Sequence, residues 1–140
     1  GIGLLKRSGF LTIVVTNQPE LSTGLLNPQE LEKMHDALYL KLGIDAIYVC
    51  PHLWNENCRC HKPEIGLVEQ AMKDFAIDLS RSFVVGDRWR DIKLGENLGC
   101  KTVYVASPSA SFDKKEFLPD FKAKDLREVA EIIIRSPLAL

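Results

Sequence analysis

The chain has 140 residues, of which 46% are hydrophobic and 26% are charged, and its formal net charge is −1. This length and composition are typical of one globular domain, so we expect a single domain over residues 1–140. The balanced charge argues against nucleic acid or an anionic membrane as a partner, because both need clustered Lys and Arg. The sequence has neither an apolar run of ~20 residues nor a recognisable signal peptide.

Patterns of helix and strand alternate along the chain. Residues 1–9 have the pattern of a helix end followed by a glycine stop, with no strand before it, so the chain looks cut at its beginning. Residues 10–16 form a β-branched run without polar alternation, which predicts a strand buried on both faces. Residues 28–42 have helical spacing of apolar side chains, with Asn27 as a cap and Gly43 as a stop. The other expected elements are strands at 46–49, 82–86 and 102–106, helices at 64–75, 91–98 and 125–134, and loops at 17–27 and 107–115.

This alternation predicts an α/β fold of the Rossmann type, in which helices cover both faces of a parallel sheet. Ligands of such sheets bind beyond the carboxyl ends of the strands. Polar residues follow three of the predicted strands: Thr16 and Asn17, then a cysteine-rich loop, then Asp87 and Arg88. We therefore expect the functional site at this edge of the sheet.

The loop at residues 50–62 carries Cys50, His52, Cys58 and Cys60 within eleven positions. Three thiolates and one imidazole suit tetrahedral zinc, and the short spacers let two turns close around one ion. The alternative is two disulfides or free thiols in a surface loop. Because four protein ligands fill a tetrahedral site, we expect structural Zn²⁺. Thiolates that hold metal also favour a reducing, cytoplasmic location.

Three further groups are candidates for chemistry, each with a structural alternative. Thr16 and Asn17 can bind phosphate oxygens, or they can simply end the strand in a turn. Lys62 precedes the helix predicted at 64–75, so its ammonium and the positive helix end can form an anion site; the alternative is a solvated lysine. Asp87 and Asp91 lie about one helical turn apart and can bind magnesium, unless Asp87 merely caps the next helix.

Taken together and in this order, the segments 14–18, 50–63 and 85–91 resemble the haloacid dehalogenase (HAD) superfamily of phosphatases. More narrowly, they are similar to its zinc-containing branch of D-glycero-D-manno-heptose 1,7-bisphosphate 7-phosphatases and histidinol-phosphatases. The resemblance implies a three-layer HAD-like fold and Mg²⁺-dependent hydrolysis of a small phosphorylated metabolite, such as heptose bisphosphate. It also implies an aspartyl-phosphate intermediate.

The resemblance assigns roles to the matched residues. Thr16 would hydrogen-bond the transferring phosphoryl group beside Asn17, and Lys62 would neutralise its charge. Asp87 would bind magnesium with support from Asp91. Arg88 would face the substrate, and the zinc set would be Cys50, His52, Cys58 and Cys60. His61, which either contacts substrate or is a spare residue of the loop, replaces the arginine usual in heptose enzymes, so the sugar-phosphate specificity does not follow from the resemblance.

One family motif has no counterpart. The Asp-x-Asp-x-Thr motif carries the nucleophile and the general acid, and no Asp-x-Asp occurs in these 140 residues. In the family this motif follows the first strand, in the middle of the sheet, so we expect a sheet without that strand and a chain that lacks ~30–40 N-terminal residues and is inactive alone. The alternatives are a catalytically inactive phosphate-binding module and a zinc-stabilised interaction domain of the same fold. An unfilled slot could also invite strand exchange between chains, so the oligomeric state stays open.

Overall fold

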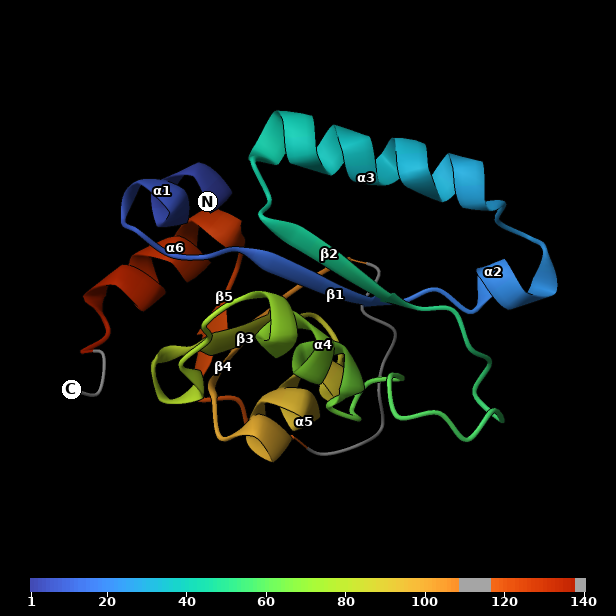
Figure 1. The fold of residues 1–140 in the computed structure, drawn as a ribbon. Coiled ribbons are helices and arrows are strands. Elements are labelled where there is room, and N and C mark those ends of the chain that lie inside the picture. Colours follow the sequence, from blue (N-terminus) through green and yellow to red (C-terminus); the bar gives the residue numbers. More distant parts are fainter. Residues whose placement is uncertain (109–116, 138–140) are drawn as a thin grey trace.

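The computed structural model describes residues 1–108 and 117–137, and Figure 1 shows their arrangement. Most of the loop expected at 107–115 therefore lies outside the described residues. No helix among those described is long and apolar enough to cross a lipid bilayer. The elements, in chain order, are α1 (Ile2–Arg7), β1 (Ile13–Asn17), α2 (Glu20–Thr23), α3 (Pro28–Leu42), β2 (Ala46–Cys50), α4 (Gly66–Asp74), the 3-10 helix η1 (Leu79–Arg81), β3 (Phe83–Gly86), α5 (Trp89–Leu98), β4 (Lys101–Val105), β5 (Phe121–Ala123) and α6 (Leu126–Arg135).

The strands confirm the expected α/β fold and form two separate parallel sheets. One sheet has the order β1-β2 and the other has the order β3-β4-β5. In the first, Ile13 lies opposite Ala46; in the second, Phe83 lies opposite Lys101. β1 and β3 are therefore edge strands within the described part of the chain. This break in the sheet agrees with the expected absence of a central strand.

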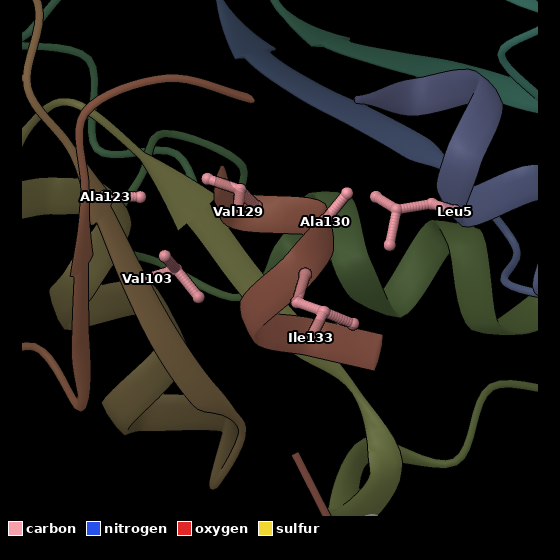
Figure 2. Close-up of a cluster of buried hydrophobic side chains, with 6 residues drawn as sticks. All are labelled: Leu5, Val103, Ala123, Val129, Ala130 and Ile133. Atoms are coloured by element: carbon pink, nitrogen blue, oxygen red, sulfur yellow. The ribbon is translucent and has the colours of Figure 1, made fainter. Parts of the chain in front are cut away.

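Helices cover both faces of the three-stranded sheet. Thr102 and Val103 are neighbours in β4, so their side chains point to opposite faces. Thr102 lies against α5, because a Cβ added at Gly95 of that helix would meet Thr102 Cγ2 at 2.3 Å. On the opposite face, a hydrophobic cluster joins β4 and β5 to α1 and α6 (Figure 2); its members are Leu5, Val103, Ala123, Val129, Ala130 and Ile133. The order of layers is therefore helix, sheet, helix.

The prediction that the first strand is buried on both faces is wrong. Every residue of β1 and of β3 is only partly buried, whereas β4, which has a partner on each edge, buries Thr102 and Val103. The cause is a cleft of about 640 Å³ that β1 and β3 both border. The apolar character of a strand thus shows what it is suited to contact, and its burial depends on its neighbours.

The capping residues and apolar spacing of the sequence predicted the bounds of α3 correctly, but not which of its side chains are buried. The helix spans the predicted residues, Asn27 Oδ1 accepts a hydrogen bond from the Glu30 N–H at 2.8 Å, and Gly43 ends it with φ of 66°. Of the apolar residues that predicted it, however, Leu31 is buried while Met34 and Leu42 are exposed. Capping and propensity determine the helix locally, but they do not supply a surface for it to pack against.

In each sheet, a threonine and an aspartate hydrogen-bond to each other near the amino ends of the strands. The Thr12 N–H and hydroxyl donate to the Asp45 carboxylate at 2.7 and 3.0 Å, and Lys6 Nζ donates to its other oxygen. Asp120 accepts from the N–H and hydroxyl of Thr102 at 2.7 and 2.9 Å in the same way. β1 begins at Ile13, three residues later than predicted.

We expect Asp45→Asn to lower the free energy of unfolding at pH 7 by about 1.5–3 kcal/mol, the range for hydrogen bonds to charged groups. Burial acts to raise the pKa of Asp45, but the Lys6 and Thr12 donors outweigh it and hold the pKa below its ordinary value of 3.8. A lowered folded-state pKa stabilises the fold above pH 3.8, and this contribution disappears as the pH falls through the folded-state pKa. Urea unfolding of wild type and variant between pH 2 and pH 7 measures the difference.

The matched control is Asp36→Asn on α3, an exposed position where we expect a change within about 0.5 kcal/mol. If the difference in free energy of unfolding between wild type and Asp45→Asn persists unchanged at pH 2, the ionised Asp45 carboxylate is not what stabilises this end of the sheet.

Candidate active site and metal centre

Lys62 connects the carboxyl ends of β1 and β3. Its backbone N–H donates to Asn17 Oδ1 at 3.1 Å, and its Nζ donates to the Val15 carbonyl at 3.1 Å and to Asp91 Oδ1 at 2.7 Å. The Lys62 and Asp91 side chains are only 16% and 10% exposed. A solvated lysine, the structural alternative, is therefore excluded. The predicted anion site at the start of the next helix stays a prediction: α4 begins at Gly66, and the ammonium bonds to Asp91 in the first turn of α5.

Asp91 has two structural tasks besides the ion pair. Its Oδ2 accepts the Arg88 N–H at 3.2 Å, which satisfies a free donor at the start of α5. Its carboxylate also packs against Gly86, where an added Cβ would lie 2.2 Å from Oδ2. Arg88, and not Asp87, is the N-cap of the helix, so the alternative in which Asp87 serves as that cap is wrong.

Asp87 and Thr16 lie at strand ends without a direct bond to Lys62 among the described residues. The Asp87 carboxylate is 36% exposed, with Arg88 Nε 3.9 Å from its Oδ1. Thr16 Oγ1 accepts a hydrogen bond from Gln18 Nε2 at 3.1 Å. A partly exposed carboxylate that caps no helix is a suitable ligand for a hard cation such as Mg²⁺. Lys62 thus bonds directly to Asn17 and Asp91. Thr16 and Asp87 are close to these partners in the sequence but make no direct bond to Lys62 among the described residues.

The four predicted metal ligands converge on one point. The ligand atoms of Cys50, His52, Cys58 and Cys60 all lie within 4.8 Å of one another, and all four cysteines of the chain are free thiols. Tetrahedral zinc with Zn–S bonds of about 2.3 Å needs sulfurs about 3.8 Å apart. The Cys50–Cys58 sulfur distance of 3.7 Å meets this requirement, and the Cys50–Cys60 distance of 2.9 Å must increase by about an ångström. The donor set therefore fits a closed four-ligand zinc site, and the structure pairs none of these thiols in a disulfide.

The protonation of the three thiols differs with their surroundings. Burial, assisted by the neighbouring Cys60, raises the pKa of Cys50 to about 12, and burial also raises the pKa of Cys60. Burial pushes the pKa of Cys58 upward too, but hydrogen bonds from the backbone N–H groups of Cys60 and His61 outweigh it and lower that pKa. A dication bound to such a set holds all three as thiolates, so metal binding releases protons.

A group of aromatic and cationic residues beside the cluster was not predicted from the sequence. The Arg90 guanidinium lies 3.8 Å from the Trp54 ring centre and 5.0 Å from that of Trp89. The Trp54 ring contacts His61 edge-on at 4.0 Å between ring centres, and His61 Nε2 is buried without a hydrogen-bond partner in the structure. Burial, with Arg90 nearby, lowers the pKa of His61. These residues come from two segments that are distant in the sequence, so no local pattern of residues predicts their contact.

Comparisons with known proteins agree with this geometry. A family model described as HAD-hydrolase-like matches residues 59–129. A probable D-glycero-D-manno-heptose-1,7-bisphosphate 7-phosphatase from Thermoplasma acidophilum is 39% identical over 107 residues, covering 70% of this chain and 67% of that protein. The histidine biosynthesis bifunctional protein HisB of Campylobacter jejuni subsp. doylei is 35% identical over 124 residues, covering 85% of this chain.

The solved structure of a D,D-heptose 1,7-bisphosphate phosphatase from B. bronchiseptica, complexed with magnesium and phosphate, superposes with a TM-score of 0.83 at 28% identity. The superposition covers 96% of this chain and 79% of that structure. The chain thus spans about two thirds of the Thermoplasma relative and 35% of HisB. The family model covers half of the chain and the Thermoplasma relative aligns over two thirds of its own length, so the chain belongs to the HAD-like hydrolase family of phosphatases.

Proposed function

We propose that this domain hydrolyses a phosphomonoester of a small metabolite, with a sugar phosphate such as heptose bisphosphate as the first substrate to test. The observation that carries the proposal is the buried Lys62–Asp91 pair, held between Asn17 at the end of β1 and Gly86 at the end of β3. A buried ammonium at the carboxyl ends of parallel strands is suited to bind a phosphoryl group. Relatives named as heptose bisphosphate phosphatases support this choice of substrate.

Each nearby side chain has a role in this proposal. Lys62 neutralises charge that develops on the phosphoryl oxygens, while Thr16 and Asn17 hydrogen-bond them. Asp87 holds magnesium with support from Asp91, and Arg88 and His61 face the substrate. Bound Mg²⁺ would supply further neutralisation of the phosphate charge. The B. bronchiseptica structure, which contains magnesium and phosphate, supports this ion.

The attacking carboxylate is the part of the mechanism that these residues do not supply, because the sequence contains no Asp-x-Asp. We propose that an aspartate from a polypeptide segment outside these 140 residues forms a bond to phosphorus while the bond to the substrate oxygen breaks. The released alkoxide takes a proton from a general acid on the same segment. Water then attacks phosphorus, the deprotonated acid takes a proton from that water, and the bond from phosphorus to the aspartate breaks to give inorganic phosphate and the free carboxylate. The same absence favours a second candidate function, a phosphate-binding module that cleaves nothing.

We further propose that Cys50, His52, Cys58 and Cys60 hold a structural Zn²⁺ that orders the loop leading to Lys62. The donor set and its convergence support this ion. Because thiolate ligands are retained in a reducing compartment, the site is in keeping with a cytoplasmic protein.

The proposed hydrolysis predicts an activity that depends on the missing motif. A form extended at its N-terminus by a strand segment that ends in Asp-x-Asp-x-Thr is expected to hydrolyse small phosphorylated metabolites in the presence of Mg²⁺, and the 140-residue chain is not. In the extended form, Lys62→Met and Asp87→Asn should each lower kcat/KM by about 10²–10³-fold. Lys62→Met removes the positive charge that faces the phosphoryl group, and Asp87→Asn removes a carboxylate ligand of the proposed Mg²⁺. Release of inorganic phosphate from a metabolite panel is the measurement.

Lys93→Met on α5 is the matched control, since this exposed lysine pairs with Glu96 in the same helix and with no other carboxylate in the described part of the chain. It should leave kcat/KM unchanged. Hydrolysis by the 140-residue chain alone would refute the proposed source of the nucleophile, and phosphate binding without hydrolysis in the extended form would favour the binding module.

The second prediction concerns the metal. The purified chain should contain about one zinc ion per molecule by elemental analysis, and Cys58→Ser should lose that zinc and lower the Tm, because a closed site adds its binding free energy to folding. Cys100→Ser is the control, because Cys100 is buried outside the cluster and should leave the zinc content unchanged. A Cys58→Ser variant that keeps its full zinc content would show that the four-ligand assignment is wrong.

A further inference from the structure

The tip of the metal loop, residues 53–57, lies between two of the four clustered ligands, His52 and Cys58, and contributes no residue to that cluster. Two of its backbone hydrogen bonds are local: the Glu56 N–H donates to the Leu53 carbonyl at 3.1 Å, and the Cys58 N–H donates to the Glu56 carbonyl at 2.8 Å. Figure 1 shows the loop, in green, as a long excursion between β2 and α4. Local bonds fix the shape of the tip, but its position against the rest of the protein needs a contact with another element.

A stack of side chains supplies such a contact between the tip and α5. The Trp54 ring is exposed, and the Arg90 guanidinium lies over it at 3.8 Å from the ring centre. Trp89, the neighbour of Arg90 in the first turn of α5, has its ring centre 5.0 Å from the same guanidinium. Arg90 forms no ion pair with a carboxylate in the part of the chain that the structure describes. The flat guanidinium is therefore oriented by the aromatic rings, an attraction that needs no carboxylate.

This stack and the buried ion pair begin at the same turn of α5. Arg90 and Asp91 are consecutive residues; the first contacts Trp54, and the second accepts from Lys62 Nζ at 2.7 Å. The Trp54 ring contacts His61 edge-on, with 4.0 Å between the ring centres, and His61 directly precedes Lys62. The contacts thus form a closed ring from Arg90 through the loop to Lys62 and back to α5 through Asp91.

A closed ring of contacts restrains Lys62 at both of its ends. The ion pair holds only the ammonium, which is a point charge on a flexible four-carbon stem. Its backbone belongs to the metal loop, so a movement of the loop away from α5 would draw the side chain out of the site. The stack of Arg90 on Trp54 opposes that movement, because it holds the part of the loop that packs against the residue before Lys62.

We propose that Arg90 is a positioning residue for Lys62: by stacking on Trp54, it holds the metal loop closed against α5. The ammonium of Lys62 is thereby kept at the carboxyl ends of the strands. The inference rests on the proposed function in one respect, since that function makes this ammonium the group that binds phosphate.

The test measures how fast an amine-acetylating reagent modifies Lys62 in the purified 140-residue chain, by mass spectrometry of its peptides. In the wild type the reaction should be slow, because the Lys62 side chain is largely buried and ion-paired. Arg90→Ala and Trp54→Leu should each raise the rate at least about threefold, the effect expected for loss of one cation–π contact. Loss of a nearby positive charge by itself favours the unreactive, protonated form of an amine, so a faster reaction reports opening of the loop.

Two further variants separate the stack from other effects of the substitutions. The double variant of Arg90→Ala and Trp54→Leu should react no faster than either single variant, because both remove the same contact. Trp54→Phe, which keeps an aromatic face for the guanidinium, should stay within about twofold of the wild-type rate.

The matched control is Arg127→Ala, which should leave the Lys62 rate unchanged. Arg127 is the second residue of α6, as Arg90 is of α5, and its side chain is exposed. Lys6 is the internal reference, because it is partly buried and paired with Asp45 at the other end of the first sheet. Its acetylation rate should be the same in every variant.

A wild-type Lys62 rate in Arg90→Ala would overturn the inference, and so would an equal acceleration at Lys6, which indicates general loosening of the fold. Acceleration in the double variant equal to the product of the two single ones, or a Trp54→Phe rate as high as that of Trp54→Leu, would also overturn it. Because the readout is independent of hydrolysis, the two proposals can fail separately. If Lys62 reacts faster as expected but the N-terminally extended form releases no phosphate, the positioning role stands and the proposed function fails. If that form hydrolyses phosphomonoesters while the Lys62 rate is unchanged by Arg90→Ala, the function stands and the positioning role fails.

Discussion

The buried ion pair between Lys62 and Asp91 is the contact on which the arrangement of the site depends. The two sheets share no ladder of backbone hydrogen bonds among the described residues, and Lys62 joins them through Asn17 and Val15 on one side and Asp91 on the other. Taking two charges out of water is costly, and an apolar pair of similar volume often stabilises a fold as well or better. The pair is therefore weak evidence for stability and better evidence for a site that needs a fixed positive charge.

The metal cluster and this lysine form one structural unit because they are adjacent in the chain. Cys60 and Lys62 are separated by one residue, and the loop returns to α4 through a bond from the Gly66 N–H to the Arg59 carbonyl at 2.9 Å. A Cβ at Gly66 would lie 2.3 Å from that carbonyl oxygen, so glycine is needed for the close approach. Short connections of this kind leave the loop little freedom once its four ligands are held together. A metal ion held by the four ligands would therefore also fix the position of Lys62.

The sequence predicted those features whose causes are local. Asn27 and Gly43 set the bounds of α3, and the spacing of the four Cys and His residues indicated their convergence. Features that depend on distant neighbours were missed or wrong. β1 lacks the burial that its apolar run predicted because no described strand pairs with one of its edges, and the short strand β5 has too few residues to give a pattern. The stacking of Arg90 on Trp54 joins segments 36 positions apart, and no propensity encodes it.

Lys62 lines the cleft between the two sheets, and its hydrogen-bonding capacity links this cleft to the proposed phosphate site. An ammonium has three donors, and two of them are used by the Val15 carbonyl and Asp91. The third can serve an anion at the end of the cleft without breaking either bond. In the proposed function, the attacking aspartate and the phosphoryl group of the substrate would both be drawn to this charge, which would bring nucleophile and electrophile to the same place.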